Sequence, residues 1–453
     1  MSGSNGYPPD FRFGVASSAF QIEGAAREDG RGESIWDRFT RRPGAIAGGD
    51  TADVACDHYH RWEADLDLMQ ALGVESYRFS ISWSRVMPMG LGPANPAGLR
   101  FYRRLVEGLL ERGIEPIATL YHWDLPQTLQ EVGGWASRDT AKRFADYAAL
   151  MVDELGDLVT DWVTHNEPWV VAFLGHAYGV KAPGLRDWPA ALRVSHHLLL
   201  SHGLARAAIH AGVADARVGV ALNLNPIRPE TDSEEDRAAA RRMDGHLNRW
   251  FLDPLLRGGY PKDMVELYEG KFGRLDAVRD GDLELIGQPL EFLGLNYYMP
   301  QRWRHAPGAG PLDMEPAPPE PPLTAMGWEI DAGGLLEMLR WIHTDYDPAL
   351  PIYVTENGAA FDDPQVNGTG YVDDPERTEY LQNHLEAIRT ALSEGIDVQR
   401  YCLWSLLDNF EWEHGYGKRF GIVYVDYETQ RRVPKRSGLW YRDYIQGARN
   451  GAG

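Results

Sequence analysis

Residues 76–123 read SYRFSISWSRVMPMGLGPANPAGLRFYRRLVEGLLERGIEPIATLYHW and contain the pattern that decides the fold. The ends of this stretch, 76–83 and 116–123, are short apolar runs of the kind found in buried strands. Between them, apolar side chains recur at helical spacing, at Leu99, Tyr102, Leu105 and Leu109. Gly113 then stands where the C-terminus of a helix favours a left-handed residue. The stretch therefore predicts a strand, a helix and a second, parallel strand.

The same alternation continues along the chain. Eight short apolar runs, bounded by glycine, proline or charged residues, occur at 11–17, 76–83, 116–123, 162–168, 217–224, 292–298, 351–358 and 398–408. Further amphipathic helix patterns occur at Tyr59, Trp62, Leu66 and Met69 and at Leu381, Leu385, Ile388 and Leu392. Eight strands that alternate with helices indicate a parallel sheet, and eight is also the number that closes a barrel.

An open, doubly wound sheet is the rival fold, and it usually binds a nucleotide through a glycine-rich first turn. Here the first run leads into Ser18-Ala19-Phe20-Gln21, and the chain contains neither G-x-G-x-x-G nor the G-x-x-x-x-G-K-[ST] phosphate loop. We therefore predict the α/β class and a single (β/α)8 TIM barrel with extended βα loops.

The predicted organisation is one barrel over residues 10–447, with a flexible N-terminal segment at 1–9 and a C-terminal tail at 448–453. The longest irregular stretch, 308–325, is rich in proline and cannot form a helix or a central strand. Because it follows the sixth predicted strand, a barrel would place it over the active face. It is expected there either as a flexible lid or as a disordered surface insertion.

Composition narrows the classes of partner. The 453 residues include 66 acidic and 45 basic side chains, a formal net charge of −21, which argues against nucleic acid or an anionic membrane as the main partner. No apolar run approaches the roughly 20 residues of a membrane span, and residues 1–9 lack the features of a signal peptide. Cys56 and Cys402 are interpreted as free thiols, so a cytoplasmic location is expected.

Polar and aromatic residues stand at the ends of the predicted strands, where a barrel places its site. They are Arg78, His122, Trp123, Asn166, Glu167, Asn223, Asn296, Tyr297, Tyr298, Glu356, Asn357 and Trp404. This set lacks the several His or Asp ligands that a metal centre needs, so no metal and no cofactor are predicted. The histidines on helix patterns are interpreted as structural, namely His58, His60, His196, His197 and His202.

Two of these residues, Glu167 and Glu356, end the fourth and the seventh strand and are expected on opposite sides of the ring. Paired carboxyls across such a mouth suit the cleavage of an acetal, because one can attack the anomeric carbon while the other donates a proton to the leaving oxygen. A separation of about 5–5.5 Å would mean retention through a covalent glycosyl-enzyme, and roughly 6.5–9.5 Å would mean inversion through a bound water.

Six motifs, in this order, resemble glycoside hydrolase family 1, the β-glucosidases and their relatives. They are FGVASSAFQIEG at 13–24, YRFSISWSR at 77–85, YHWDLP at 121–126, THNEP at 164–168, YVTENG at 353–358 and WSLLDNFEW at 404–412. The resemblance covers almost the whole chain. It implies a cofactor-free retaining β-glycoside hydrolase, most often a β-glucosidase, that releases terminal β-D-glucose and tolerates galactosides or fucosides. Its partner would be a small-molecule β-glycoside.

The resemblance also implies roles for individual residues. Glu356 resembles the nucleophile and Glu167 the acid/base. The residues that resemble the glycone-binding groups are Gln21, His122, Asn166, Glu411 and Trp412, with Trp404 beneath the sugar. Those that resemble the neighbours of the nucleophile are Arg78, Asn296 and Tyr298. Walls of the aglycone site are implied at Trp169 and Trp328, joined by Asn223 and Phe420. Trp123, at the end of the third strand, completes the substrate-binding candidates.

Elementary electrostatics assigns the same roles to the two glutamates. A nucleophilic carboxylate must be ionised, and Arg78 and Tyr298 are expected to lower the pKa of Glu356. Partial burial and the charge of Glu356 are expected to raise the pKa of Glu167, so that it begins the reaction protonated. Once Glu356 carries the sugar its charge is gone, and Glu167 should then become more acidic and act as the base.

A few positions distinguish between sub-classes of this family. Glu411 would repel, and Trp412 would block, the phosphate of a 6-phosphosugar, and Lys418 in the same loop does not reverse this. Glu167 stands where thioglucosidases have glutamine. Residues 328–332 lack the proline that often follows the tryptophan, which leaves aglycone choice open.

The alternatives are a transglycosidase using the same glutamates, a sugar-binding protein without catalysis, and a metal-dependent barrel enzyme. The sequence makes no prediction of the oligomeric state.

Overall fold

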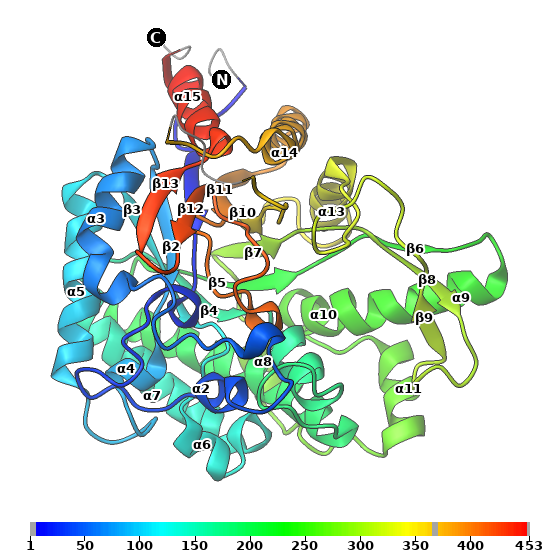
Figure 1. Cartoon of the computed structure of the whole chain (residues 1–453). Coiled ribbons are helices and arrows are strands. Elements are labelled where there is room, and N and C mark those ends of the chain that lie inside the picture. The colour runs from blue at the N-terminus through cyan, green and yellow to red at the C-terminus, as the bar shows by residue number, and fades with distance from the viewer. Residues whose placement is uncertain (1–5, 365–369, 451–453) are drawn as a thin grey trace.

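The computed structural model of the protein describes residues 6–364 and 370–450. Eight parallel strands close into a barrel, in the spatial order β1-β11-β10-β7-β5-β4-β3-β2 (Figure 1). The barrel strands are β1 (Arg12–Ala16), β2 (Ser76–Ser80), β3 (Glu115–Tyr121), β4 (Asp161–Asn166), β5 (Arg217–Asn223), β7 (Phe292–Asn296), β10 (Ile352–Asn357) and β11 (Val398–Trp404). Each overlaps one of the predicted apolar runs, and the predicted (β/α)8 barrel is confirmed.

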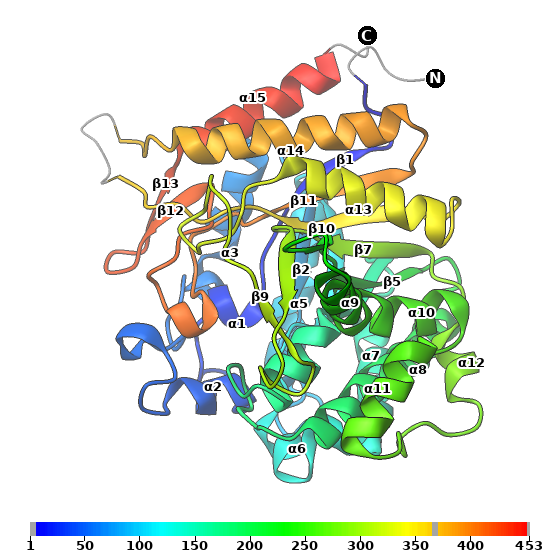
Figure 2. The same ribbon diagram turned by 90° about the vertical axis from the view of Figure 1, so that its right-hand side faces the viewer.

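Helices surround this barrel. Those that follow individual barrel strands are α3 (His58–Ala71), α5 (Pro96–Glu111), α7 (Arg138–Leu155), α8 (Trp188–Gly212), α13 (Ala332–Asp345), α14 (Pro375–Ser393) and α15 (Arg436–Asn450). Between β5 and β7 lie α10 (Trp250–Arg257), α11 (Lys262–Phe272) and α12 (Asp282–Ile286). Both views show α14 beside α15 along one side of the barrel (Figures 1 and 2).

Side chains alternate along each barrel strand between the interior and the surrounding helices. On β2, the ring of Phe79 packs outward and lies 6.5 Å from the ring of Tyr102 on α5. The preceding residue, Arg78, is buried and therefore points to the interior. The interior itself is filled, because Phe292 and Tyr353 stack across neighbouring strands with ring centroids 3.9 Å apart. A barrel packed in this way leaves room for a site only at its carboxyl end.

The strand register brings the predicted site residues to one level. Ala16 is paired with both Arg78 of β2 and Trp404 of β11. On the other side, Asn296 of β7 is paired with both Asn223 of β5 and Glu356 of β10. Because these pairs all lie near the carboxyl ends of their strands, their side chains meet at one mouth of the barrel.

The two glutamate strands are not diametrically opposed. In the closed order, only β5 and β7 separate β4 from β10 on one side, whereas β3, β2, β1 and β11 separate them on the other. The expectation that Glu167 and Glu356 lie on opposite sides of the ring is therefore wrong in that strict sense. The strand order brings them closer together around the mouth than the expected placement would.

Short elements between the barrel strands and helices extend this frame. They are α1 (Ala19–Ile22), α2 (Ile35–Thr40), η1 (Ala47–Gly49), α4 (Trp83–Val86), α6 (Gln127–Glu131), η2 (Gly134–Ala136), η3 (Val170–Leu174), β6 (Ile227–Pro229), α9 (Glu234–Asp244), η4 (Gly245–Arg249), β8 (Gln301–His305), β9 (Met314–Pro316), η5 (Trp412–His414), β12 (Val423–Asp426) and β13 (Arg431–Pro434). Strands β6, β8 and β9 form a small sheet that projects from the barrel with α9 (Figure 1).

The proline-rich stretch 308–325 is folded onto this small sheet. It contains β9, which pairs antiparallel with β8 at the sheet edge, where a strand tolerates proline. Leu312 and Met314 are buried, and Arg242 Nε of α9 donates to the Leu312 carbonyl at 3.0 Å. These contacts argue against a disordered insertion, while the alternative of a flexible lid stays a prediction.

The described terminal residues lie close to each other. Tyr7 is buried, and its hydroxyl is 2.9 Å from the hydroxyl of Tyr444 on α15. Helix α15 itself runs across the predicted boundary at residue 447, and the proposed division into segment, barrel and tail stays a prediction. No helix within residues 6–364 or 370–450 combines the length and the apolar character that crossing a bilayer requires.

Candidate active site

A cavity of about 310 Å³ opens at the carboxyl end of the barrel. The predicted site residues that line it are His122, Trp123, Glu167, Trp169, Asn223, Asn296, Tyr298, Trp328, Glu356, Trp404, Glu411, Trp412 and Phe420. Gln21, Arg78 and Asn166 lie behind its surface, buried and hydrogen-bonded to residues that line it. The fold thus brings both glutamates and their predicted neighbours to one hollow.

Glu356 ends β10, next to a point where the chain closely approaches β11. Gly358 has no room for a side chain there, because an added Cβ would lie 1.7 Å from the Trp404 carbonyl oxygen. The buried carboxyl of Glu356 accepts hydrogen bonds from Arg78 Nη1 at 2.7 Å and from the Tyr298 hydroxyl at 2.7 Å. A cation and a phenol therefore hold both of its oxygens.

Burial raises the pKa of Glu356 above its ordinary value, and Arg78 and Tyr298 offset part of that rise. Arg78 and Tyr298 lower this pKa, as expected, although the net direction is upward. The reason is that the carboxyl is buried more deeply than the sequence alone indicates, and loss of hydration outweighs the two partners. Arg78 and Tyr298 nevertheless favour the ionised form of this carboxyl.

Glu167 follows β4 in a left-handed backbone conformation, with φ of 48°. Such a conformation is strained for a residue with a side chain, and strain of this kind concentrates at functional sites. The Glu167 N–H donates to the Ala221 carbonyl of β5 at 2.8 Å, and its carboxyl accepts from Asn296 Nδ2 at 2.8 Å. Burial, and then the charge of Glu356, raise the pKa of Glu167 to about 8.

The two carboxyls are close enough to influence each other, and their surroundings differ. The Asn296 amide lowers the pKa of both, which places it between them. Glu356 contacts a guanidinium, whereas the direct hydrogen-bond donor to Glu167 is this neutral amide. When a single proton is shared by such a pair, it resides on Glu167. The two carboxyls of this cavity therefore differ in how readily each one holds a proton.

Asn166 connects the glutamates to the third strand. Its Oδ1 accepts from Arg78 Nη2 at 2.6 Å and from Asn296 Nδ2 at 3.0 Å, and its Nδ2 lies 3.1 Å from His122 Nε2. Burial, and then the charge of Arg78, hold the pKa of His122 well below its ordinary value, so the ring is neutral. Nδ1 of His122 is buried without a protein partner in the described residues.

Indole rings line the cavity on the side of β3 and the loop after β11. The Trp412 ring is held by Trp36 and Trp123, each with its centroid 4.4 Å away. The Trp123 indole N–H donates to the Asn166 carbonyl at 2.9 Å, and the Trp404 ring lies 5.7 Å from the ring of His122. These contacts fix flat apolar surfaces beside polar groups, as recognition of a sugar ring requires.

Glu411 is a third buried carboxyl at the cavity. Gln21 Nε2 lies 3.3 Å from its Oε2 and also donates to the Phe410 carbonyl at 2.9 Å. Burial raises the pKa of Glu411 to about 8, and the nearby ammonium of Lys181 opposes the rise. Its acceptor oxygens therefore face the cavity with few protein donors.

Several lining residues were missed by the sequence reasoning. They are Val170, Leu174, Lys181, Asn225, Met299, Gln301, Met326, Glu413 and His414. Lys181 is the most consequential, because it pairs with Glu413 and lies 5.4 Å from the centroid of the Trp123 ring. It comes from an irregular loop between η3 and α8, where neither periodicity nor a predicted strand end marks it.

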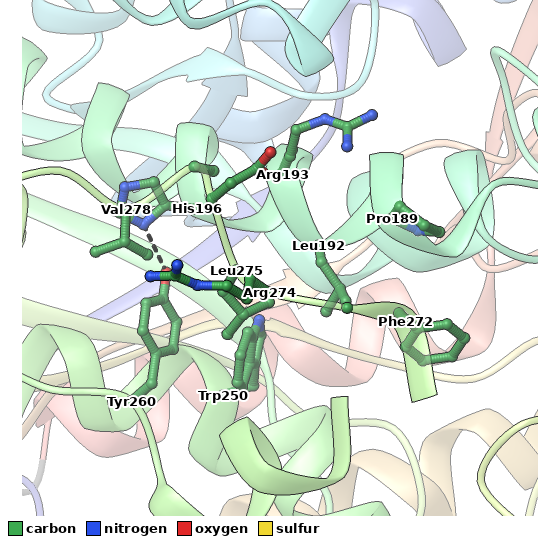
Figure 3. Close-up of a pocket in the computed structure, with 13 residues that line it drawn as sticks. Pro189, Leu192, Arg193, His196, Trp250, Tyr260, Phe272, Arg274, Leu275 and Val278 are labelled. Carbon is green, nitrogen blue, oxygen red and sulfur yellow. Dashed lines mark hydrogen bonds between the residues drawn. The ribbon is translucent and has the colours of Figure 1, made fainter. Parts of the chain in front are cut away.

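The helical histidines lie away from this cavity. Figure 3 shows His196 beside Tyr260 at a separate small cavity of about 140 Å³, and its ring nitrogens contact the Tyr260 hydroxyl at 2.9 Å and Asp282 at 2.8 Å. The other contacts pair His58 with Asp65, His60 with Asp57, His197 with the Trp135 carbonyl and His202 with Thr164. In the part of the chain that the structure describes, no group of three or more His, Cys, Asp or Glu side chains could hold a metal ion.

Comparison with known proteins gives consistent matches over nearly the full length. A family model described as "Glycosyl hydrolase family 1" matches residues 3–450. Beta-glucosidase A of Acetivibrio thermocellus is 47% identical over 444 residues, which cover 97% of this chain and 98% of that protein. A bifunctional beta-D-glucosidase/beta-D-fucosidase of Bifidobacterium breve is 47% identical over 459 residues, covering 97% and 98%. The solved structure of a family 1 beta-glucosidase from Thermotoga maritima in complex with isofagomine lactam superposes with a TM-score of 0.93 at 44% identity, covering 98% of this chain and 99% of that one.

Proposed function

The chain belongs to glycosyl hydrolase family 1 and is a retaining β-glucosidase, and from this premise we propose that Glu356 is its nucleophile and Glu167 its general acid and base. The observation that carries this assignment is the unequal environment of the two carboxyls. Arg78 and Tyr298 donate to Glu356 and favour its charge, whereas burial and the charge of Glu356 keep a proton on Glu167.

In the first step, Glu356 attacks the anomeric carbon and forms a glycosyl ester, while Glu167 gives its proton to the departing glycosidic oxygen. Esterification removes the negative charge that raises the pKa of Glu167. The Glu167 carboxylate then takes a proton from water, which attacks the anomeric carbon and displaces Glu356. Two displacements at one carbon retain the β configuration of the released glucose.

The glycone site is proposed to lie between the indole of Trp404 and a set of polar groups. His122 offers its unpartnered ring nitrogen, and the Glu411 carboxyl offers acceptor oxygens to sugar hydroxyls. The Thermotoga maritima relative carries isofagomine lactam in its complex, which supports binding of glycoside-like ligands here. The Bifidobacterium breve relative is named for both glucosidase and fucosidase activity, so we also propose tolerance for β-fucosides.

Covalent trapping tests the assignment of the nucleophile. A 2-deoxy-2-fluoro-β-glucosyl fluoride is expected to inactivate the enzyme and to add one fluoroglucosyl group to Glu356. The fluorine at C2 slows both formation and breakdown of the ester, whereas the reactive fluoride leaving group speeds formation only, so the ester accumulates. Peptide mapping by mass spectrometry locates the label. A label on any other side chain, with Glu356 unmodified, would overturn the assignment.

The pH dependence of activity follows from the pKa of about 8 for Glu167. The free enzyme needs this carboxyl protonated and Glu356 ionised. kcat/KM is therefore expected to fall about tenfold for each pH unit above pH 8, and to fall again at low pH where Glu356 takes up a proton. Initial rates with an alkyl β-glucoside, measured from pH 5 to pH 10, give the profile. A flat profile up to pH 10 would contradict the proposed role of Glu167.

A cytoplasmic location is also proposed. Cys56 and Cys402 are unpaired and buried, and burial raises the pKa of the Cys402 thiol to about 12. Two such thiols fit a reducing compartment. Fractionation of the source cells tests this, with β-glucosidase activity expected among the cytoplasmic proteins and activity in the medium arguing against it.

A further inference from the structure

The loop between β11 and β12, residues 405–422, carries five residues that line the catalytic cavity. They are Glu411, Trp412, Glu413, His414 and Phe420. Apart from the short turn η5, this loop contains no helix or strand, so its shape depends on contacts with other segments. It also folds closely upon itself, because a Cβ added at Gly421 would lie 2.1 Å from the backbone nitrogen of Asp408. We call residues 405–422 the site loop.

The carboxyl of Asp408 holds the two arms of the site loop together. This side chain is fully buried, and its Oδ1 accepts from the Gly421 N–H at 3.0 Å and from Lys435 Nζ at 2.7 Å. Its Oδ2 accepts from Arg419 Nη1 at 2.7 Å. Two of these donors come from the far arm of the loop, so Asp408 fixes that arm against the one that leads to Glu411.

Lys435 joins the site loop to the segment that follows the strand of Glu356. It lies between β13 and α15, and its side chain is 0% exposed. Besides Asp408, its ammonium pairs with Asp363, which follows β10 and has a side chain that is 1% exposed. Its backbone N–H donates to the carbonyl of Ile422, at the end of the site loop, at 2.9 Å. One buried cation thus connects the loops that follow β10 and β11.

The charges around Lys435 are balanced. Arg377 Nη1 of α14 donates to Asp363 at 2.9 Å and also contacts Asp374, and its Nη2 donates to the Arg419 carbonyl at 2.8 Å. Among the described residues, this charge cluster contains three carboxylates and three cations, namely Asp363, Asp374, Asp408, Arg377, Arg419 and Lys435. All of these side chains except Arg419 are at most 2% exposed. Loss of one member would therefore leave an uncompensated buried charge.

We propose that Lys435 is a positioning residue for the sugar site, because it neutralises Asp363 and Asp408 and so keeps the site loop in the shape that presents Glu411 and Trp412 to the glycone. The proposal rests on the glycone site proposed above and adds a residue that does not line the cavity. Without the ammonium, the charge cluster carries a surplus negative charge, which moves toward water if the loop shifts. The fraction of molecules with a competent sugar site then falls, and the apparent affinity falls by the same factor.

Lys435→Met tests the proposal, since it removes the charge and keeps the length of the side chain. The dissociation constant of 1-deoxynojirimycin, a glucose-shaped inhibitor, is expected to rise about tenfold or more, because only molecules with a competent loop bind it. KM for an aryl β-glucoside should rise by a similar factor, whereas kcat, which reports molecules that have already bound substrate, should change less. Calorimetry well below the unfolding temperature of the variant measures the affinity.

A second substitution restores the charge balance. In Lys435→Met with Asp363→Asn, Asp408 keeps Arg419 and Arg377 keeps Asp374, so the dissociation constant should return to within about twofold of the wild-type value. Asp363→Asn alone leaves a surplus positive charge and should raise the constant about fivefold. Adding Lys435→Met to Asp363→Asn is therefore expected to tighten binding, which tests the proposal even if Lys435→Met alone does not fold.

Arg138→Met is the matched control for a purely structural effect. It breaks the pair of Arg138 with Asp282, whose side chain is 2% exposed, and neither residue lines the catalytic cavity. This variant should lower the unfolding temperature and leave the dissociation constant of the inhibitor unchanged, because its pair joins α7 to α12 rather than holding the site loop.

The outcomes separate this proposal from the one on which it rests. An unchanged dissociation constant in folded Lys435→Met, or a double variant that binds no better than either single variant, would overturn the positioning role. Glu411→Gln is expected to weaken inhibitor binding directly. Wild-type affinity in Glu411→Gln would reject the proposed glycone site itself, whereas weak binding there together with wild-type affinity in Lys435→Met would reject only the role of Lys435.

Discussion

Replacing Glu356 by alanine is expected to lower kcat/KM for every β-glucoside about 10⁵-fold or more. Deletion of a covalent nucleophile removes the reaction path itself rather than one contact along it, so losses of this size are general. Activated and poor leaving groups should be affected alike, because no glycosyl ester can form with either. Initial rates with an aryl β-glucoside and with cellobiose measure the effect.

A small anion distinguishes loss of chemistry from loss of folding. In Glu356→Gly, added azide can occupy the space of the missing carboxyl and attack from the same face, so α-glucosyl azide is expected as product. Glu356→Gln is the isosteric control, and it keeps a group against the buried Arg78, whose unpaired charge would otherwise destabilise the fold. Retention of a tenth of the wild-type rate in Glu356→Ala would contradict the assignment.

Replacing Glu167 by alanine is expected to give a loss that depends on the leaving group. For alkyl glucosides and cellobiose, kcat/KM should fall about 10²- to 10⁴-fold, since their leaving oxygens need the proton that Glu167 supplies. For 2,4-dinitrophenyl β-glucoside the first step should be nearly unaffected, because that leaving group departs as an anion. Added azide should restore turnover and give β-glucosyl azide, through attack on the glycosyl-enzyme from the face that water uses.

The pH profile distinguishes the titration of Glu167 from that of Glu411. Glu411 also has a pKa raised to about 8, so either group could in principle produce the basic limb. In Glu167→Ala with the dinitrophenyl substrate, the limb of kcat/KM near pH 8 should disappear while Glu411 remains in place. An unchanged limb would assign it to Glu411, and equal losses for good and poor leaving groups would count against acid catalysis by Glu167.

Much of the barrel was predictable because its signals are local. The alternation of Tyr77 and Phe79 with Arg78 marks a strand, and the spacing of Leu105 and Leu109 marks a helix, whatever lies elsewhere in the chain. Once eight such units follow one another, closure places every strand end at one mouth. The predicted residues that line the cavity are therefore mostly those at strand ends or inside the quoted motifs.

Residues in the loops between the strands and helices showed no comparable sequence pattern. Lys181 reaches the cavity from an irregular loop and pairs with Glu413 of η5, so the contact joins segments that are far apart in the chain. The folding of residues 308–325 onto the small sheet depends likewise on the pairing of β9 with β8. Neither contact leaves a periodic pattern in the amino-acid sequence.

The sequence by itself determined the class of fold, the order of the strands along the chain and the pair of glutamates, because each depends on residue types and spacings along one segment. Only the tertiary structure decided how far around the ring those glutamates lie, how deeply they are buried and what adjoins them. Burial shows this most clearly. The net rise in the pKa of Glu356 comes from the loss of water around its carboxyl, and many segments of the chain exclude that water together. The hollow of about 740 Å³ that adjoins the catalytic cavity arises in the same way, where loops after several different strands meet.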